Sequence, residues 1–341
     1  MKAAPVLRAL AGRDGVCQTI VHTGQHYDAN MSDVFFRELD IPEPDVNLQV
    51  GSGSHAQQTA SIMSRFETVV LEKKPDIVLV YGDVNSTVAA AIVCAKLLVR
   101  VGHVEAGLRS FDRTMPEEIN RLLTDQISDI LFTPSQDGDE NLIREGVARE
   151  KIFFIGNVMI DTLVRLLPKA KAQIASDLPD RYALVTMHRP ANVDDADFMR
   201  GMLDALKEVG CAMPVLFPIH PRTRQRLSEF GLSDGHDSLR FMDPLSYLQF
   251  LGLQTRAAVV ITDSGGIQEE TTFLGVPCLT VRENTERPIT VSLGTNTLVG
   301  RDMKVLRQEL RKVAAGTNRV RKIPPLWDGH ASERIAEVLL K

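Results

Sequence analysis

Short apolar runs alternate with helix-like segments from one end of the chain to the other. One such segment, residues 54–73, places Ile62, Phe66 and Val70 on one helical face and begins with Ser54, a residue type that often caps helices. Apolar strands that alternate with helices predict parallel sheets covered by helices on both faces. The predicted strands are residues 16–22, 76–81, 99–104, 130–133, 151–155, 182–187, 214–219, 238–241, 257–262 and 278–281.

The alternation is interrupted once, between residues 156 and 178, where lysines replace the strand pattern. We therefore predict two doubly wound α/β domains. The first comprises residues 1–156, joined by a closing helix within residues 329–341, and the second comprises residues 157–328. A further helix is predicted from Pro116, because proline suits the first helical position and acidic residues follow it.

Composition places the chain among globular proteins. A length of 341 residues suits two domains, and 44% hydrophobic with 24% charged residues is the usual balance. The four cysteines are widely scattered, which predicts neither a disulfide framework nor a zinc site, and we expect a cytoplasmic protein without a signal peptide. The net charge of −5, with basic residues unclustered, disfavours nucleic acid but not a small anionic ligand.

Carboxylates follow two predicted strands of the first domain. Asp83 comes after residues 76–81 and Glu105 after residues 99–104, while Glu117 begins the next helix. A single loop acid more often caps a helix than performs chemistry. Three acids at one sheet edge favour a functional site, because ligands of parallel sheets bind beyond the carboxyl ends of the strands.

The second domain offers complementary groups at its strand ends. His188 and His220 each follow a predicted strand, although a lone histidine is usually a surface or packed residue. Ser264-Gly265-Gly266 lies between a strand and a helix, which fits either a tight turn or a phosphate site at a helix N-terminus. A cation in the downstream loop, Arg287, favours the phosphate interpretation.

These segments together resemble the non-hydrolysing UDP-N-acetylglucosamine 2-epimerases, in order and with the family's spacing, from Lys2 onward. The resemblance implies two Rossmann-like domains facing across a cleft, the GT-B arrangement of many glycosyltransferases. The matching segments are Gly82-Asp83 and residues 103–109, 116–121, 262–270 and 285–288.

The resemblance also assigns site residues. It implies catalytic roles for Asp83, Glu105, Glu117 and His188. It implies ribose binding by Glu270 and diphosphate binding by Arg287. The remaining UDP-binding matches are Ser264, Gly265, Gly266, the weaker matches Lys2 and Phe250, and His220 as a further cleft residue.

The activity implied is interconversion of UDP-N-acetylglucosamine and UDP-N-acetylmannosamine, which supplies precursors of surface polysaccharides, in a homodimer. UDP would be eliminated to give a 2-acetamidoglucal and then added back. This route needs a base, an acid on the opposite face and a pocket for the diphosphate, but neither NAD nor a metal. Which of the three carboxylates is the base stays open.

Three alternatives remain at this point. The first is a 2-epimerase of a UDP-2,3-diacetamido-uronic acid, because residues 22–31 and Ser110-Phe111 resemble that subgroup, although Glu270 and residues 285–288 fit the N-acetylglucosamine group better. The second is a GT-B-type glycosyltransferase. The third is a nucleotide-sugar-binding protein without catalysis.

The chain departs from the family's pattern in two places. Family members carry a strand and a Gly-Thr-Arg-Pro-Glu loop ahead of the lysine that matches Lys2, so we expect the functional protein to be longer. Some bacterial members have a second, activating substrate site, of which Gln25-His26 match part. Tyr27, Asp28 and Ser61 differ from its usual residues, which disfavours such a site here.

Overall fold

The computed structural model describes residues 1–25, 38–174, 178–232, 238–316 and 322–341. The chain forms two compact units: Met1–Thr162 with Pro325–Lys341, and Leu163–Pro324. The division falls within helix α7 (Val158–Ala172), whereas the sequence pattern places it near residue 156. The first turn of α7 belongs to unit 1 because the Asp161 carboxylate accepts the amides of Ala331 (3.1 Å) and Ser332 (2.7 Å) at the start of the closing helix.

Unit 1 contains a parallel sheet in the order β3-β4-β5-β6. Two short strands, β1 (Val21–His22) and β2 (Val46–Asn47), form a separate parallel pair, and no ladder joins them to β3 in the described part of the chain. The strand predicted over residues 16–22 is therefore shorter than expected. The four sheet strands are β3 (Ile77–Tyr81), β4 (Arg100–Val104), β5 (Ile130–Thr133) and β6 (Ile152–Phe154).

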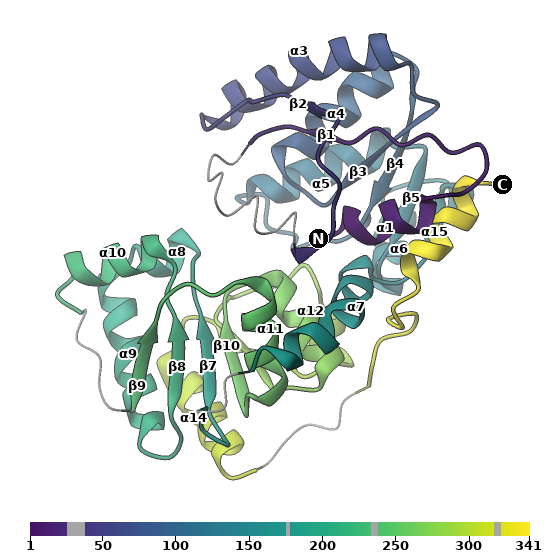
Figure 1. The fold of residues 1–341 in the computed structure, drawn as a ribbon. Helices are drawn as coiled ribbons and strands as arrows, with labels where there is room; N and C mark the ends of the chain where they lie inside the picture. The colour runs from purple at the N-terminus through teal and green to yellow at the C-terminus, as the bar shows by residue number, and fades with distance from the viewer. Residues whose placement is uncertain (26–37, 175–177, 233–237, 317–321) are drawn as a thin grey trace. The chain divides into compact units, whose positions relative to one another are not determined.

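Helices cover both faces of this sheet (Figure 1). Val78 and Val80 of β3 pack toward α3 and α4, while Ile77 and Leu79 pack toward α1 and α15. The helix α3 begins at a capping box formed by Ser54 and Gln57, as the sequence predicts for its first turn. The helices of unit 1 are α1 (Ala3–Leu10), α3 (His55–Lys73), α4 (Asn85–Lys96), α5 (Pro116–Ile127), α6 (Gln136–Arg144) and α15 (Ala331–Leu339), with a 3₁₀ turn at Arg149–Lys151.

Unit 2 is built on a six-stranded parallel sheet in the order β12-β11-β10-β7-β8-β9. The strand order reverses between β7 and β10, which makes this the switch point where doubly wound sheets bind ligands. The sequence did not predict β12, whose polar first residue interrupts the apolar pattern. The strands are β7 (Ala183–Thr186), β8 (Val215–Pro218), β9 (Leu239–Met242), β10 (Val259–Thr262), β11 (Cys278–Thr280) and β12 (Asn296–Leu298).

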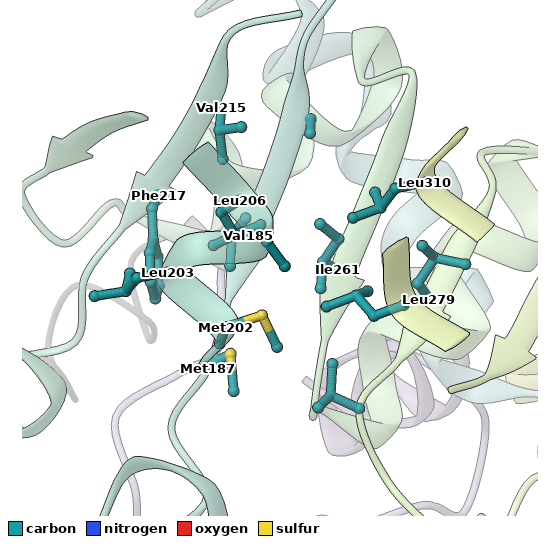
Figure 2. Packing of buried hydrophobic residues seen from close by; sticks show 14 of the residues in the cluster. Val185, Met187, Met202, Leu203, Leu206, Val215, Phe217, Ile261, Leu279 and Leu310 are labelled. Carbon is teal, nitrogen blue, oxygen red and sulfur yellow. The ribbon is translucent and has the colours of Figure 1, made fainter. Parts of the chain in front are cut away.

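The core of unit 2 has two layers, one on each face of the sheet. Val185, Phe217 and Ile261 belong to one apolar cluster with residues of α9 and α14, and Figure 2 shows them with Met202, Leu206 and Leu310 of that cluster. The alternate residues Leu184, Leu216 and Val260 pack toward α11 and α12. The helices are α8 (Pro190–Val193), α9 (Ala196–Gly210), α10 (Pro221–Glu229), α11 (Tyr247–Arg256), α12 (Gly265–Leu274), α13 (Ile289–Ser292) and α14 (Met303–Ala314).

The predicted α/β class, with two parallel sheets, is confirmed. Within the described ranges, none of the helices is both long and apolar enough to cross a membrane.

Candidate functional site

The carboxyl edge of the unit 1 sheet brings a carboxylate and an ammonium together. Glu105 follows β4, is 6% exposed, and forms an ion pair with Lys2. Its φ of 76° lies in the left-handed region, which is uncommon for a residue with a side chain and is often found at functional sites. The turn thus presents the Glu105 carboxylate beside Lys2.

Gly82 makes this ion pair possible. A Cβ at this position would lie 2.6 Å from Lys2 Nζ and 3.4 Å from Glu105 Oε2, and the φ of +67° also favours glycine. The ion pair therefore lies directly against the backbone of the turn after β3. That turn carries Asp83, so the two predicted carboxylates come from adjacent strand ends.

Asp83 is held by helix α5. Its carboxylate pairs with Arg121, and its backbone oxygen accepts a hydrogen bond from Asn120 Nδ2 at 2.9 Å. Arg121 is fully buried and also donates to Glu118 Oε2 from Nε (3.0 Å) and Nη2 (2.7 Å). The Asp83 side chain stays partly exposed, so it is fixed in place yet open to solvent.

The two glutamates that begin α5 differ sharply. Glu117 is exposed, whereas Glu118 is buried and accepts the amides of Ser110 (3.0 Å) and Phe111 (2.9 Å). Burial alone would raise the pKa of Glu118, but these hydrogen bonds and Arg121 hold it below its usual value. Glu118 thus has the structural role expected of an ordinary loop acid.

In unit 2, a buried arginine lies against a helix start. Ser264 is the N-cap residue of α12, and a Cβ on Gly265 would lie 2.5 Å from Arg287 Nη1. The guanidinium therefore occupies the space that any side chain at Gly265 would need. Free amides at a helix N-terminus and an adjacent cation are the elements of an anion site.

The Arg287 charge is already compensated. Its Nε lies 2.8 Å from Glu269 Oε1, and its Nη1 pairs with Glu286, whose other oxygen accepts from Arg282 at 2.7 Å. The two guanidinium groups hold the pKa of Glu286 far below its usual range, although burial acts in the opposite direction. The sequence predicts a cation here but not its carboxylate partners, of which Glu286 is its neighbour in the same loop and Glu269 comes from α12.

Glu270 is 2% exposed, and both of its carboxylate oxygens are occupied. Tyr247 donates to Oε1 at 3.0 Å and Gln254 to Oε2 at 2.6 Å. Burial raises the pKa of Glu270 to about 7. Sequence reasoning missed Tyr247 and Gln254, although their spacing of seven residues places them on one face of α11, the helix that also carries the partly buried Phe250.

His188 lies at the switch point of the unit 2 sheet. Its Nδ1 is 3.0 Å from Asp263 Oδ1, and the same buried carboxylate accepts the amide of Arg189 at 2.9 Å and the side chain of Asn192 at 3.2 Å. Asp263 thereby fixes the imidazole, whose ring is half exposed. His220 caps α10; partial burial lowers its pKa, as do nearby His188 and Arg222.

A buried amide network supports the phosphate-type turn. Asn296, on the strand that the sequence did not predict, donates to Gln268 Oε1 at 3.0 Å. Gln268 in turn donates to the Ser264 carbonyl at 3.3 Å, and Thr285 donates to Gln268 Oε1 at 2.7 Å. The network joins the start of α12 to the loop that carries Arg287.

Two further expectations from the sequence concern a metal site and the activating substrate site. In the described ranges no group of three or more His, Cys, Asp and Glu side chains could hold a metal ion. Of the two residues that match the activating site, Gln25 accepts a hydrogen bond from Ser86 at 2.7 Å and His26 lies outside the described residues. Of the three that depart from it, Ser61 lies in α3, and Tyr27 and Asp28 also lie outside the described residues.

Two α/β units, each with a parallel sheet that carries polar side chains at the carboxyl ends of its strands, define an α/β protein of the Rossmann-like class. Residues 8–340 match the family described as UDP-N-acetylglucosamine 2-epimerase. The chain belongs to this family and is an epimerase.

Full-length relatives agree with the family. A UDP-N-acetylglucosamine 2-epimerase of Methanocaldococcus jannaschii is 42% identical, over 99% of this chain and 95% of the relative. A UDP-2,3-diacetamido-2,3-dideoxy-D-glucuronate 2-epimerase of Pseudomonas aeruginosa is 43% identical, over 100% of this chain and 96% of the relative. The crystal structure of Methanocaldococcus jannaschii UDP-GlcNAc 2-epimerase with UDP-GlcNAc and UDP superposes with a TM-score of 0.90 at 42% identity, over 99% of this chain and 96% of that chain.

Proposed function

We propose that this epimerase interconverts UDP-N-acetylglucosamine and UDP-N-acetylmannosamine. Full-length similarity to a UDP-N-acetylglucosamine 2-epimerase, at 42% identity, is the observation that carries the proposal. The positions of the family motifs support it. The acidic motifs lie at the strand ends of unit 1, and the glycine motif lies at the helix start beside the switch point of unit 2.

Carbon 2 of the sugar has no carbonyl group beside it to acidify its C–H bond. Elimination avoids this difficulty, because a carboxylate removes the proton while the C1–O bond to UDP breaks. The 2-acetamidoglucal then takes UDP back at carbon 1 as a proton reaches carbon 2 from the other face. In this proposal Asp83, Glu105 and Glu117 exchange these protons, and His188, oriented by Asp263, also takes part in the reaction.

Unit 2 binds the UDP part of the substrate in this proposal. Backbone amides at Ser264–Gly266 and the Arg287 guanidinium receive the diphosphate, and Glu270 receives the ribose hydroxyls. Phe250 and His220 belong to the same binding surface, and Lys2 supports Glu105 in unit 1. Tyr247 and Gln254 must then share Glu270 with the ribose, since both already bond to it.

The test is solvent exchange at carbon 2. The protein is incubated with UDP-N-acetylglucosamine in D₂O, and the sugars are followed by proton NMR and mass spectrometry. We expect UDP-N-acetylmannosamine carrying deuterium at carbon 2, because the enzyme carboxylates exchange their protons with solvent. If UDP-N-acetylglucosamine gains no deuterium at carbon 2 and no UDP-N-acetylmannosamine forms, the proposal is contradicted.

A second candidate is favoured by the Pseudomonas aeruginosa relative, which is 43% identical and named as a diacetamido-glucuronate 2-epimerase. The subgroup-like pair Ser110-Phe111 lies at the turn before α5, where Phe111 is 71% exposed and Ser110 bonds to Glu118. The two candidates are separated by kcat/KM for the two UDP-sugars, measured side by side. A higher value for the diacetamido-uronic acid would replace the first proposal.

We also propose a cytoplasmic homodimer. Leu123 and Ile119 on α5 are apolar and exposed, at 48% and 38%, on a helix whose buried residues are polar. In this proposal the partner subunit covers these two side chains, which lie one helical turn apart. Light scattering after size exclusion should give twice the 37.7 kDa chain mass, and Leu123→Glu should shift the protein toward the monomer. A wild-type monomer at micromolar concentration would contradict this.

A further inference from the structure

A fully buried histidine lies beneath the strand ends that carry the proposed catalytic carboxylates. His103 is on β4, two residues before Glu105, and its side chain points toward α5. Its Nδ1 lies 2.6 Å from Asp125 Oδ1, and its Nε2 lies 2.9 Å from the carbonyl oxygen of Gly82. Nothing in the proposed reaction yet uses either His103 or Asp125.

The hydrogen bonds determine where the protons are. A carbonyl oxygen only accepts, so Nε2 of His103 must carry a hydrogen. Asp125 Oδ2 accepts the amide of Gly107 at 3.1 Å and lies 2.7 Å from Arg109 Nη1, and both donors favour the ionised carboxylate. An ionised carboxylate has no hydrogen to give, so Nδ1 of His103 must donate as well. The ring is then an imidazolium.

The charges around the ring balance. Arg109 also forms a bidentate pair with Glu145, through Nε (2.8 Å) and Nη2 (2.6 Å). Two cations therefore face two carboxylates, of which Glu145 is partly exposed, and this pairing makes the burial of the other three charges tolerable. Although burial alone would raise the pKa of Asp125, His103 and Arg109 keep it below its usual value.

Asp125 connects the two turns of the site. Through His103 it reaches the carbonyl of Gly82, directly before Asp83. Through the amide of Gly107 it reaches the turn that begins with Glu105. One aspartate of α5 is therefore linked to both turns that carry the proposed catalytic carboxylates.

We propose that His103, held as an imidazolium, and Asp125 form a buried positioning pair that sets Glu105 and the Asp83 turn for proton transfer at carbon 2. The proposal rests on the proposed function. Neither residue touches substrate. A misplacement of about 1 Å can cost roughly 100-fold in rate, so the pair acts on turnover rather than on UDP binding.

Protonation is tested directly on the full-length chain labelled with ¹⁵N-histidine. We expect both ring nitrogens of His103 to resonate as protonated at pH 7, because both hydrogen-bond partners of the ring are acceptors. In Asp125→Asn, which retains the size but not the charge, the His103 signal should become that of a neutral ring. A wild-type His103 with one unprotonated nitrogen at pH 7 would overturn the proposal.

Positioning is tested by kinetics. Asp125→Asn should lower kcat by about 100-fold while KM and the calorimetric Kd for UDP change less than threefold. Glu145→Gln is the matched control, because it breaks an ion pair of the same Arg109 but touches neither turn, and its kcat should stay within threefold. A folded Asp125→Asn with wild-type kcat would overturn the positioning role.

The two proposals fail in different ways. If the proposed function is wrong, wild-type protein shows no turnover of either UDP-sugar. If only the proposal of a positioning pair is wrong, the wild-type protein turns over a UDP-sugar and Asp125→Asn has the same kcat. His103→Gln, which retains a donor for the Gly82 carbonyl but no charge, serves if Asp125→Asn does not fold, and its kcat should also fall about 100-fold.

Discussion

At the start of α5, burial distinguishes a glutamate with a proposed catalytic role from a neighbouring glutamate with a structural role. Glu117 is exposed, while Glu118 bonds to two backbone amides and to Arg121. The motif contains both, and the resemblance alone selects Glu117 as catalytic. Their environments give the physical basis for testing that choice.

Glu117→Gln should retain the unfolding temperature of the wild type and lose roughly 10²–10⁴ in turnover, as expected for a general acid or base. Glu118→Gln should instead lower the free energy of unfolding by roughly 2–3 kcal/mol, because hydrogen bonds of a buried charge are lost. Urea unfolding and initial rates on both variants provide the measurement. Normal turnover in Glu117→Gln would remove that residue from the mechanism.

A second residue-scale consequence concerns Glu270. Burial raises its pKa from 4.5 to about 7, so the folded chain keeps this proton at pH values where the unfolded chain has released it. The unfolded state therefore gains stability as the pH rises above about 4.5. The contribution of Glu270 to folding falls by on the order of 3 kcal/mol between pH 5 and 8.

The side chain of Glu270→Gln has no charge at any pH, so the free energy of unfolding of this variant should not fall in this way as the pH rises. We expect the free energy of unfolding of the variant, relative to wild type, to increase steadily from pH 5 to pH 8. Urea unfolding at pH 5, 6.5 and 8 measures the difference. Parallel pH dependences of the two proteins would show that Glu270 titrates near its ordinary value.

At the scale of elements, caps and periodicity act within a few residues. The Ser54 side chain accepts the amide of Gln57, and the Gln57 side chain accepts the amide of Ser54. Ser54→Ala should therefore lower the free energy of unfolding by about 1 kcal/mol, without changing the UDP affinity of unit 2. Ser52→Ala, two residues before the N-cap, is the control and should leave stability unchanged. Equal unfolding midpoints for both variants would disprove the cap's contribution.

Helix α5 reverses the usual amphipathic pattern, in which apolar residues are buried and polar residues are exposed. Its buried residues are polar, including Asn120, Arg121 and Asp125, while Leu123 is exposed. The unusual placement is explained by what these residues do, since each bonds to a strand-end turn of the sheet. A helix whose polar face is buried is thus itself a signal of a site, and it is readable from the structure alone.

At the scale of the whole molecule, the two units carry different tasks in the proposed reaction. If unit 2 alone binds UDP, the nucleotide should slow amide hydrogen exchange at residues 264–270 and 282–287 and leave β5 of unit 1 unaffected. Exchange followed by mass spectrometry with and without UDP provides the measurement. Protection of unit 1 strands without any in unit 2 would contradict the assignment of UDP binding.

The amino-acid sequence by itself determined most of the elements and the family. The alternation of apolar strands with helices predicted parallel α/β architecture, and the motifs identified the family that the full-length match shows. Ser54 and Pro116 marked true helix starts. These features are local: periodicity, caps and strand-end motifs are encoded within a few neighbouring residues.

Only the tertiary structure decided which polar groups meet. Arg287 has carboxylate partners, both oxygens of Glu270 are occupied, and Asp125 joins two turns through His103. Short strands such as β2 and β12 also came from the structure, because two or three residues that include polar ones form no apolar run in the sequence. One physical reason explains these pairings of polar groups. A buried charge takes the partner that the folded sheet brings within hydrogen-bond distance, and no local pattern encodes residues brought together from distant parts of the chain.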